Sequence, residues 1–502
     1  MSRVKQAFSV PVPTQKNEDG FPAYERSLEE RYVQMLLTNT LGNTFYASGQ
    51  RLLEEASEMH TSMIEADPEF AAKALVYARQ NGYMRTQPVF GLVKLSASNL
   101  PLFKKIFSDV ILTPADLQDF FTILKSEGRG HGGRGIKSTV ARWLNNNLSE
   151  YWAIKYNGRG RGYSLTDIVK LVHPKSEEKN ALYQYLVSGK VDESLKQIKA
   201  YEALKTSENV REQMELISEG KLPHEVVTGA TKMSPELWDS LVHTMPTFAL
   251  LRNLATLERA GVLDKNREFI VSRLNDPEAL TKSKILPFRF LDAYRVLGNK
   301  PWVKDMLRNS IELTFQNLPE IPGRTAIFLD ISGSMSGDPI RVASIAAFAL
   351  FKKTGGHGLL WLFNTHAYDA VPSMYDSILT QSEGVCRRVG GGTSSDAPFK
   401  ALTTKREKVD NIIVITDEQQ NSGMPLYKRL KEYQEKINRD VKTFIVNISP
   451  YTSASVPESA KNVWYIYGWS DQVLQFISLS IQGYGSMVDA IKEKQLWGPK
   501  RN

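Results

Sequence analysis

An acidic residue and two serines stand at alternate positions in the stretch FLDISGSMSG, which spans residues 328–337. Asp330 directly follows the apolar run TAIFL, so we expect it at the end of a buried strand, with Ser332 and Ser334 in the loop beyond. Carboxylates and hydroxyls are hard oxygen donors that suit Mg²⁺ or Mn²⁺, and Mg²⁺ usually keeps several water ligands in proteins. The spacing therefore predicts part of a divalent-cation site that needs further ligands from elsewhere in the chain.

Two later loops contain suitable donors. GGGTSSD places Thr393 behind three glycines, which let the backbone bend tightly, and VITDEQQ places Asp417 at the end of another apolar run. Because ligands bind beyond the carboxyl ends of the strands in doubly wound sheets, we expect both residues to meet the Asp-Ser-Ser loop. One position on the ion then remains for an acidic group of a partner. A competing interpretation makes this loop an ordinary helix start, with Asp338 before Pro339 as its cap.

Strand-like apolar runs and helical stretches alternate in the last third of the chain, after the turn NLPEIPGR. This alternation predicts a Rossmann-like, doubly wound, mostly parallel sheet covered by helices on both faces, over residues 321–502. The expected strands are 325–330, 358–363, 410–417, 441–449 and 463–469, and the expected helices are 340–353 and 425–438.

The preceding residues have a helical pattern from about Glu25 to about Leu318. Many short amphipathic segments without intervening strands favour helix pairs stacked side by side, as in solenoid folds, although no fixed sequence period is visible. We therefore expect an all-α module over residues 21–320, after an N-terminal extension of residues 1–20. Typical segments are 68–82, 165–174, 246–263 and 286–298.

Length and composition set broader limits. A chain of 502 residues is too long for one ordinary hydrophobic core, so two or more domains are expected. The single cysteine, Cys386, excludes an internal disulfide framework and a cysteine-rich zinc site. No apolar run suits a secretory signal or a membrane span, so we expect a cytoplasmic protein without membrane attachment.

Positive charge is concentrated in residues 125–175, which contain ten Lys or Arg residues against three Asp or Glu residues. Two Arg-Gly clusters in this segment are interleaved with Trp and Tyr, and arginine pairs with phosphates while aromatic rings stack on unpaired bases. The segment as a whole favours nucleic-acid binding. For single residues the competing interpretation is structural, because Trp143 and Trp152 lie on expected helices and suit a core, and the glycines can end helices.

The five proposed metal ligands match a known motif as a set. Asp330, Ser332, Ser334, Thr393 and Asp417 resemble the metal-ion-dependent adhesion site of von Willebrand factor A domains. The resemblance implies that the two serines and the threonine touch the ion, and that the aspartates bind it directly or through water.

The order of the segments gives a second resemblance. GRGIKSTVARWLNN, AIKYNGRGRGYSLTDIVKLVHPK, MPTFALLRNL and KILPFRFLDAY, followed by an A-type domain, resemble the Ro 60 kDa autoantigen family, or TROVE-module proteins, and we expect a bacterial or phage relative. The resemblance implies a monomeric ring of HEAT-like helical repeats closed by the A domain. It also implies that single-stranded ends of misfolded RNAs enter the ring, that Y-like small RNAs bind a basic outer surface, and that an exoribonuclease is a candidate partner in RNA quality control or stress response.

The resemblance implies that three residues contact RNA, because Lys155, Arg159 and His173 match the family's RNA-contacting positions. His173 has an equally good structural role, because it precedes Pro174 at an expected helix end, where it can cap the last carbonyls. The Arg-Gly loops are longer here than in the animal pattern, which changes the outer surface. Charge alone adds four candidates: Arg134, Lys137, Arg142 and Arg161.

Three functions compete. The first is a noncoding-RNA-binding protein without catalysis of its own. The second is a protein-interaction scaffold whose A domain grips an acidic partner residue through Mg²⁺. The third, a metal-dependent nuclease, is disfavoured because the site consists mostly of hydroxyls, whereas two-metal phosphoryl chemistry needs several close carboxylates. The chain also has no phosphate-binding GxxxxGK motif, so we do not expect an enzyme.

Overall fold

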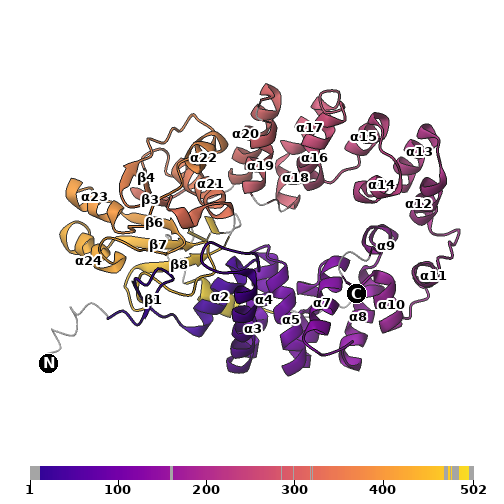
Figure 1. Cartoon of the computed structure of the whole chain (residues 1–502), viewed down its shortest axis with the longest axis horizontal. Helices are drawn as coiled ribbons and strands as arrows, with labels where there is room; N and C mark the ends of the chain where they lie inside the picture. The colour runs from indigo at the N-terminus through magenta and orange to yellow at the C-terminus, as the bar shows by residue number, and fades with distance from the viewer. Residues whose placement is uncertain are drawn as a thin grey trace.

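The computed structural model describes residues 12–158, 162–283, 285, 287–297, 299–316, 318, 320–468, 473–474, 476–477 and 486–496. A long succession of helices precedes a sheet with helices packed against it, as Figure 1 shows. The predicted fold class, a helical-repeat part followed by an α/β part, is confirmed.

The helical part follows a short hairpin of β1 (Gln15–Lys16) and β2 (Pro22–Ala23). Its helices agree with the expected amphipathic segments. They are, in chain order, α2 (Leu28–Thr38), α3 (Gly49–Ala66), α4 (Pro68–Gln80), α5 (Thr86–Ser98), α6 (Leu100–Val110), α7 (Pro114–Ser126), α8 (Arg134–Asn147), α9 (Glu150–Tyr156), α10 (Leu165–Val172), α11 (Asn180–Ser188), α12 (Lys196–Thr206), α13 (Val210–Gly220), α14 (His224–Ala230), α15 (Pro235–Val242), α16 (Thr247–Arg259), α17 (Arg267–Leu274), α18 (Pro277–Ser283), α19 (Phe288–Leu297) and α20 (Pro301–Phe315).

Local capping explains where many of these short helices begin. Thr113 and Asp116 form a reciprocal capping box at the start of α7, with Pro114 in the first turn. Ser164 and Asp167 form a second capping box at the start of α10. Such caps satisfy backbone N–H groups that have no partner within the helix, and each contributes about 1 kcal/mol.

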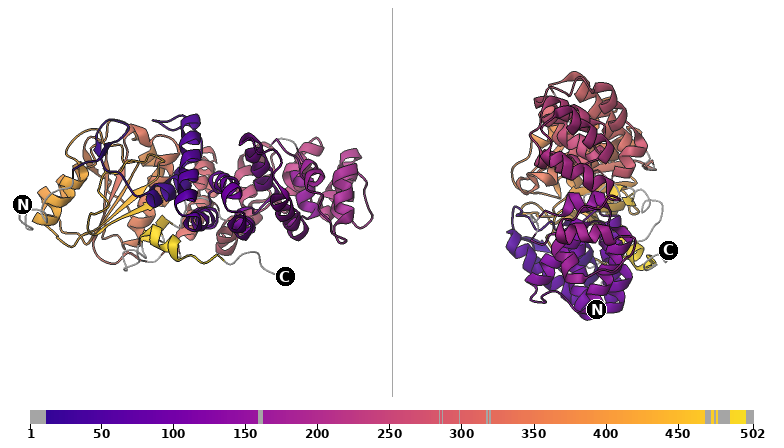
Figure 2. Two further views of the ribbon diagram at one scale, coloured as in Figure 1. Left: turned by 90° about the horizontal axis from the view of Figure 1, so that it is seen from below. Right: turned by 90° about the vertical axis from the view of Figure 1, so that its right-hand side faces the viewer.

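The helical part closes on itself through the α/β part. Its first helix, α2, packs against β8 (Val463–Tyr467), whereas α19 and α20 pack against α21 (Asp338–Lys353) and α22 (Ile378–Cys386). Figure 1 shows the helices leaving the sheet along one side, turning near α11 to α13 and returning along the other. Seen from the side in Figure 2, this loop is elongated, with the α/β part at one end. The closed arrangement implied by the resemblance is therefore present.

The sheet has the strand order β5-β4-β3-β6-β7-β8. Neighbouring strands are parallel except for β5, which pairs antiparallel with β4 at the edge. The central strands β3 and β6 are buried along their whole length, in agreement with their apolar runs. The remaining elements are β3 (Thr325–Asp330), η1 (Gly333–Met335), β4 (Leu359–Phe363), β5 (Ala367–Asp369), α23 (Ala397–Lys405), β6 (Asn411–Thr416), α24 (Leu426–Lys436), β7 (Lys442–Asn447) and α26 (Met487–Glu493).

Sequence order and spatial order differ where the chain closes. The proposed boundary at residues 320 and 321 lies in the connection between α20 and β3, but α26 returns to pack on α2 and α4. From the other side, the buried Arg26 enters the α/β part, donates to the carbonyl of Val456 at 3.0 Å and lies 3.2 Å from the ring centroid of Tyr465. Both ends of the described chain thus form the same junction.

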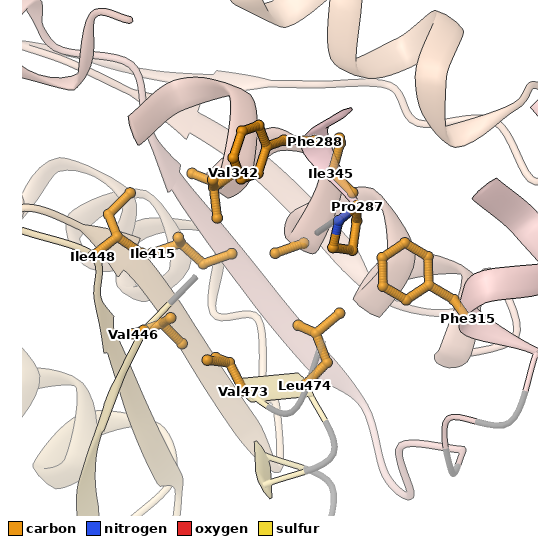
Figure 3. A pocket seen from close by; sticks show the side chains of 13 residues that line it. Pro287, Phe288, Phe315, Val342, Ile345, Ile415, Val446, Ile448, Val473 and Leu474 are labelled. Carbon is orange, nitrogen blue, oxygen red and sulfur yellow. The ribbon is translucent and has the colours of Figure 1, made fainter. Parts of the chain in front are cut away.

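A small apolar cavity lies at the other junction, between α19, α20 and α21 and the sheet (Figure 3). Phe288, Phe315 and Val342 line it from the helices, and Ile415 and Val446 line it from the strands, with side chains pointing toward one another. Its volume of about 20 Å³ holds no more than one water molecule. It is therefore a packing gap of the core rather than a ligand pocket.

Candidate functional site

The five proposed metal ligands come together at the carboxyl edge of the sheet. Asp330 ends β3, and Asp417 follows β6, the strand beside it. Ser332 and Ser334 lie in the turn after β3, with hydroxyl oxygens 3.3 Å apart, and Thr393 precedes α23. All five side chains are buried. Neighbouring parallel strands end at the same edge, which explains why residues 87 positions apart can serve one site.

Backbone hydrogen bonds hold the three loops together. The N–H of Gly333 donates to the carbonyl of Gly391 at 2.9 Å, and the N–H of Gly390 donates to Ile331 at 2.8 Å. Gly391 has φ +83°, a conformation that residues with a side chain rarely adopt. The carbonyl of Thr393 accepts from the loop after β6. The glycines before the threonine therefore shape the loop that presents it.

Among the described residues, the two aspartates leave one acceptor without a partner. Oδ1 and Oδ2 of Asp330 accept from the N–H of Ser332 at 2.9 Å and from the hydroxyl of Thr416 at 2.6 Å. Asp417 accepts through Oδ1 from the N–H of Gln419 at 3.2 Å, whereas its buried Oδ2 has no hydrogen-bond partner in this part of the chain. Burial raises the pKa of Asp330, and burial together with the Asp330 charge raises the pKa of Asp417. A cation held by these oxygens would relieve both costs, so the residues fit a divalent metal.

The competing interpretation of Asp338 as a helix cap is wrong, and the nearby acid Glu418 is used elsewhere. Asp338 is not a cap, because Gly337 occupies the N-cap position of α21 and Asp338 is already helical. Glu418 faces away from the serines and is bound by other groups: it accepts from Ser455, from the hydroxyl of Tyr465 at 2.8 Å and from Asn447. Glu418 therefore joins the core of the α/β part and does not add a carboxylate to the metal site.

The charge-based RNA candidates on α8 form an exposed face. Arg134 and Arg142 are exposed and Lys137 is half-buried, whereas the opposite face of α8 packs into the core. Among the described residues, none of the three makes an ion pair with a carboxylate. The loop after α10 lies against this face, because Asn145 donates to the carbonyl of Lys175 at 2.9 Å.

The other predicted RNA residues do not lie on α8. His173 ends α10 with φ +50°, and its N–H donates to the carbonyl of Val169 at 2.9 Å, so its backbone has the capping role while its side chain is exposed. Arg159 and Arg161 lie outside the described residues. Lys155 is directed toward α14, where it forms an ion pair with Glu225 at 3.2 Å.

Lys155 lines a cleft of 510 Å³ between α9, α14, α15 and α16. Burial by itself would lower the pKa of Lys155, but the Glu225 carboxylate and two neighbouring tyrosines outweigh it, so the pKa is raised and the charge is retained. The opposite wall carries Phe248 and Arg252, with the guanidinium carbon 5.7 Å from the ring centroid. The same pair borders a second cleft of 480 Å³, which also contains Arg289.

Sequence reasoning missed this cleft. The segment MPTFALLRNL shows the spacing of an ordinary amphipathic helix, and a single Phe-x-x-x-Arg pair carries no separate signal. The ten basic residues counted in residues 125–175 also include Arg129, whose guanidinium donates to the carbonyl of Val93 at 3.0 Å and to the hydroxyl of Ser96. The structural interpretation of the tryptophans is correct: Trp143 is buried and stacks on Trp152 with ring centroids 5.8 Å apart.

The chain is similar to known proteins along most of its length. Residues 223–301 match the family model described as the TROVE domain. The chain is 27% identical over 476 residues to "RNA-binding protein RO60" of Deinococcus radiodurans, covering 86% of this chain and 89% of that protein. It is 24% identical over 467 residues to the protein of the same name from Caenorhabditis elegans, covering 75% and 72%. The resemblance to the Ro 60 kDa family is confirmed.

The fold of this chain also matches a solved structure. The crystal structure of the Deinococcus radiodurans Ro (RSR) protein aligns with a TM-score of 0.68 at 23% identity, covering 91% of this chain and all of that one. The TROVE match includes α14 to α19, which contain one wall of the Lys155 cleft and all of the second cleft. In the described ranges, no helix is long and apolar enough to cross a membrane. In the same ranges, no group of three or more His, Cys, Asp or Glu residues is placed to hold a metal.

Proposed function

We propose that this chain is a noncoding-RNA-binding protein without catalysis of its own. The observation that carries the proposal is the similarity over most of the chain to two proteins named as RNA-binding. By the same resemblance, it holds Y-like small RNAs and the ends of misfolded RNAs as a cytoplasmic, monomeric ring, and it presents them to an exoribonuclease in RNA quality control or stress response.

The Lys155 cleft suits a single strand. It places a lysine and an arginine beside Phe248 and Trp238, which gives phosphate contacts next to rings on which bases stack. Base stacking on an aromatic side chain contributes about 1–3 kcal/mol. The exposed cations of α8 suit the phosphates of a structured RNA, which is recognised mainly by shape and backbone.

The two surfaces can be tested separately by measuring affinity against salt concentration. The variant Arg134→Gln/Lys137→Gln/Arg142→Gln should weaken binding of a structured small RNA and reduce the salt slope by about 2–3, because each lost phosphate contact removes roughly 0.7–0.9 from it. Lys436→Gln, at an exposed lysine of α24, is the matched control. An unchanged slope in the triple variant would exclude α8 as an RNA surface.

In the Lys155 cleft, removing the acidic residue Glu225 should strengthen RNA binding, whereas removing a basic residue should weaken it. Glu225 neutralises Lys155 in the free protein, so Glu225→Gln should strengthen binding of a single-stranded oligonucleotide by about threefold, in keeping with the modest energy of a half-exposed ion pair. Lys155→Gln should weaken binding, and the double variant should resemble Lys155→Gln. Weaker binding by Glu225→Gln would contradict a role of Lys155 in holding the strand.

A metal-bridged protein contact is the second candidate. It is favoured by Oδ2 of Asp417, which is buried and has no hydrogen-bond partner within the part of the chain that the structure describes. We propose that Asp330, Ser332, Ser334, Thr393 and Asp417 hold Mg²⁺, or Mn²⁺ in its place, and that the ion takes an acidic group. The ion would supply a positive charge and an open position; the protein supplies buried oxygens in fixed places. Mg²⁺ should raise the unfolding temperature of the wild type but not that of Ser334→Ala, and an equal rise in both would exclude Ser334 as a ligand.

A further inference from the structure

The metal site lies beneath another part of the same chain. The turn of the N-terminal hairpin, residues 17–20, rests on the loop after β6, which carries Asp417. Asn17 donates through its side chain to the carbonyl of Gln420 at 2.7 Å, and the N–H of Glu18 donates to Oε1 of Gln419 at 3.0 Å. The N–H of Gln419 in turn donates to Asp417. The hairpin is thus attached directly to the loop that contributes a metal ligand.

This attachment places the carboxylate of Asp19 beside the site. Oδ2 of Asp19 accepts from the hydroxyl of Tyr46 at 2.7 Å and from the side-chain amide of Asn421 at 3.1 Å. The amide oxygen of Asn421 accepts from the N–H of Thr393 at 2.9 Å. Asp19 is therefore only one side chain away from a proposed ligand, on the loop that presents it.

Tyr46 connects Asp19 to the serines. It belongs to the loop between α2 and α3, and its hydroxyl donates to Asp19 and lies close to Ser334 and within the electrostatic field of Asp417. Its position is fixed from behind, because its N–H donates to the hydroxyl of Tyr451 at 3.2 Å and the two rings meet edge to face at 5.5 Å. A rigid phenol thus holds a carboxylate near the hydroxyls that are expected to touch the ion.

We propose that Asp19 is an internal acidic ligand of the metal site, held in place by Tyr46, which competes with an acidic group from outside for the open position on the ion. This inference rests on the metal site of the proposed function and goes beyond it, because it states what occupies the position where a partner would bind. A partner must then displace Asp19, and the hairpin acts as a built-in competitor whose removal opens the site.

Mn²⁺ alone is a suitable probe, because electron paramagnetic resonance measures the free ion and water-proton relaxation reports the exchangeable water on the bound ion. In the full chain, Asp19→Asn should lower Mn²⁺ affinity by about tenfold, the size usual for losing a group that supports a metal. It should also raise the relaxivity per bound ion, since water fills the vacated position. Tyr46→Phe should change both in the same direction by less, because Asp19 loses the hydroxyl that positions it.

The matched control is Glu18→Gln. Glu18 is the neighbouring acid in the same turn, and its carboxylate pairs with Arg51. This variant should retain wild-type affinity and relaxivity. Added acetate should lower the relaxivity of Mn²⁺-loaded Asp19→Asn at concentrations that leave the wild type unchanged. Circular dichroism and the unfolding temperature without metal establish that the variants are folded.

The outcomes distinguish failure of Asp19 as an internal ligand from failure of the metal site itself. Equal affinity and relaxivity in wild type and Asp19→Asn would overturn the internal ligand while leaving the metal site intact. Absence of Mn²⁺ binding in the wild type, indistinguishable from Ser334→Ala, would overturn the metal site and with it this proposal. A change of the same size in Glu18→Gln would show a general charge effect and would also overturn it.

Discussion

His60 should make the stability of the helical part depend on pH. Its ring is fully buried in α3, where Nδ1 accepts from the hydroxyl of Tyr32 in α2 at 3.1 Å and Nε2 donates to Oε1 of Gln87 in α5 at 3.1 Å. A Cβ on Gly91 would come within 2.7 Å of the ring, so the site has no room for solvent. Burial lowers the pKa of His60 from 6.5 to about 3.

The sign and size of the effect follow from linkage. Because the folded pKa lies below the unfolded one, the unfolded chain takes up a proton first as the pH falls. The neutral ring therefore contributes stability fully above pH 6.5, and this contribution is lost progressively between pH 6.5 and about 3. At pH 5 the loss from this one group amounts to about 2 kcal/mol relative to pH 8.

The loss of unfolding free energy caused by His60 can be measured by urea unfolding at pH 8 and pH 5, followed by far-ultraviolet circular dichroism. Wild type should lose about 2 kcal/mol more between the two pH values than His60→Gln, whatever the substitution costs at pH 8. His357→Gln, at an exposed histidine, should behave like wild type. An equal pH-dependent loss in wild type and His60→Gln would refute the reasoning, because it would mean that the ring is protonated in the folded protein or that its site admits water.

Two further predictions concern buried carboxylates. Mg²⁺ binding, measured by calorimetry, should weaken from pH 8 to pH 6, since the raised pKa of Asp417 lets protons compete with the ion, and pH-independent binding would contradict this. Asp116→Asn should lower the free energy of unfolding by about 2–3 kcal/mol. The buried carboxylate accepts from Arg79 at 2.8 Å and from Arg85 at 2.6 Å, and these partly exposed cations would lose their counter-charge. An unchanged urea midpoint would show that the arginines pair elsewhere.

The convergence of the five proposed metal ligands could be predicted because their signal is local. Each lies in a loop where an apolar run or a glycine cluster marks a strand end or a tight turn, and the sheet topology brings these loops together without further information. Asp19 and Tyr46 reach the same site from the opposite end of the chain. Nothing in their neighbourhood distinguishes them from ordinary turn and loop residues, so only the folded structure shows them at the site.

Other differences between the sequence-based expectations and the structure also arise where the sequence has no local signal. The edge strand β5 is three residues long and mostly exposed, so it lacks the apolar run that identified its neighbours. Lys155 was found as a cation, but its partner Glu225 and the wall around Phe248 come from helices far along the chain. Charge counting identified residues 125–175 as basic, yet it could not separate Arg129, which fastens a turn to α5, from the cations of α8, which form no ion pair with a carboxylate among the described residues.

The junction at which α26 packs on α2 and α4 determines the order in which the molecule can be completed. A contact between helices more than 400 residues apart requires closure of a very long loop, and closure entropy grows only slowly with length, so the main constraint is timing rather than energy. During synthesis, the faces of α2 and α4 that α26 covers stay exposed until α26 has left the ribosome. The newly made chain is therefore an open arc until β8 reaches α2, and α26 then covers the junction that has formed.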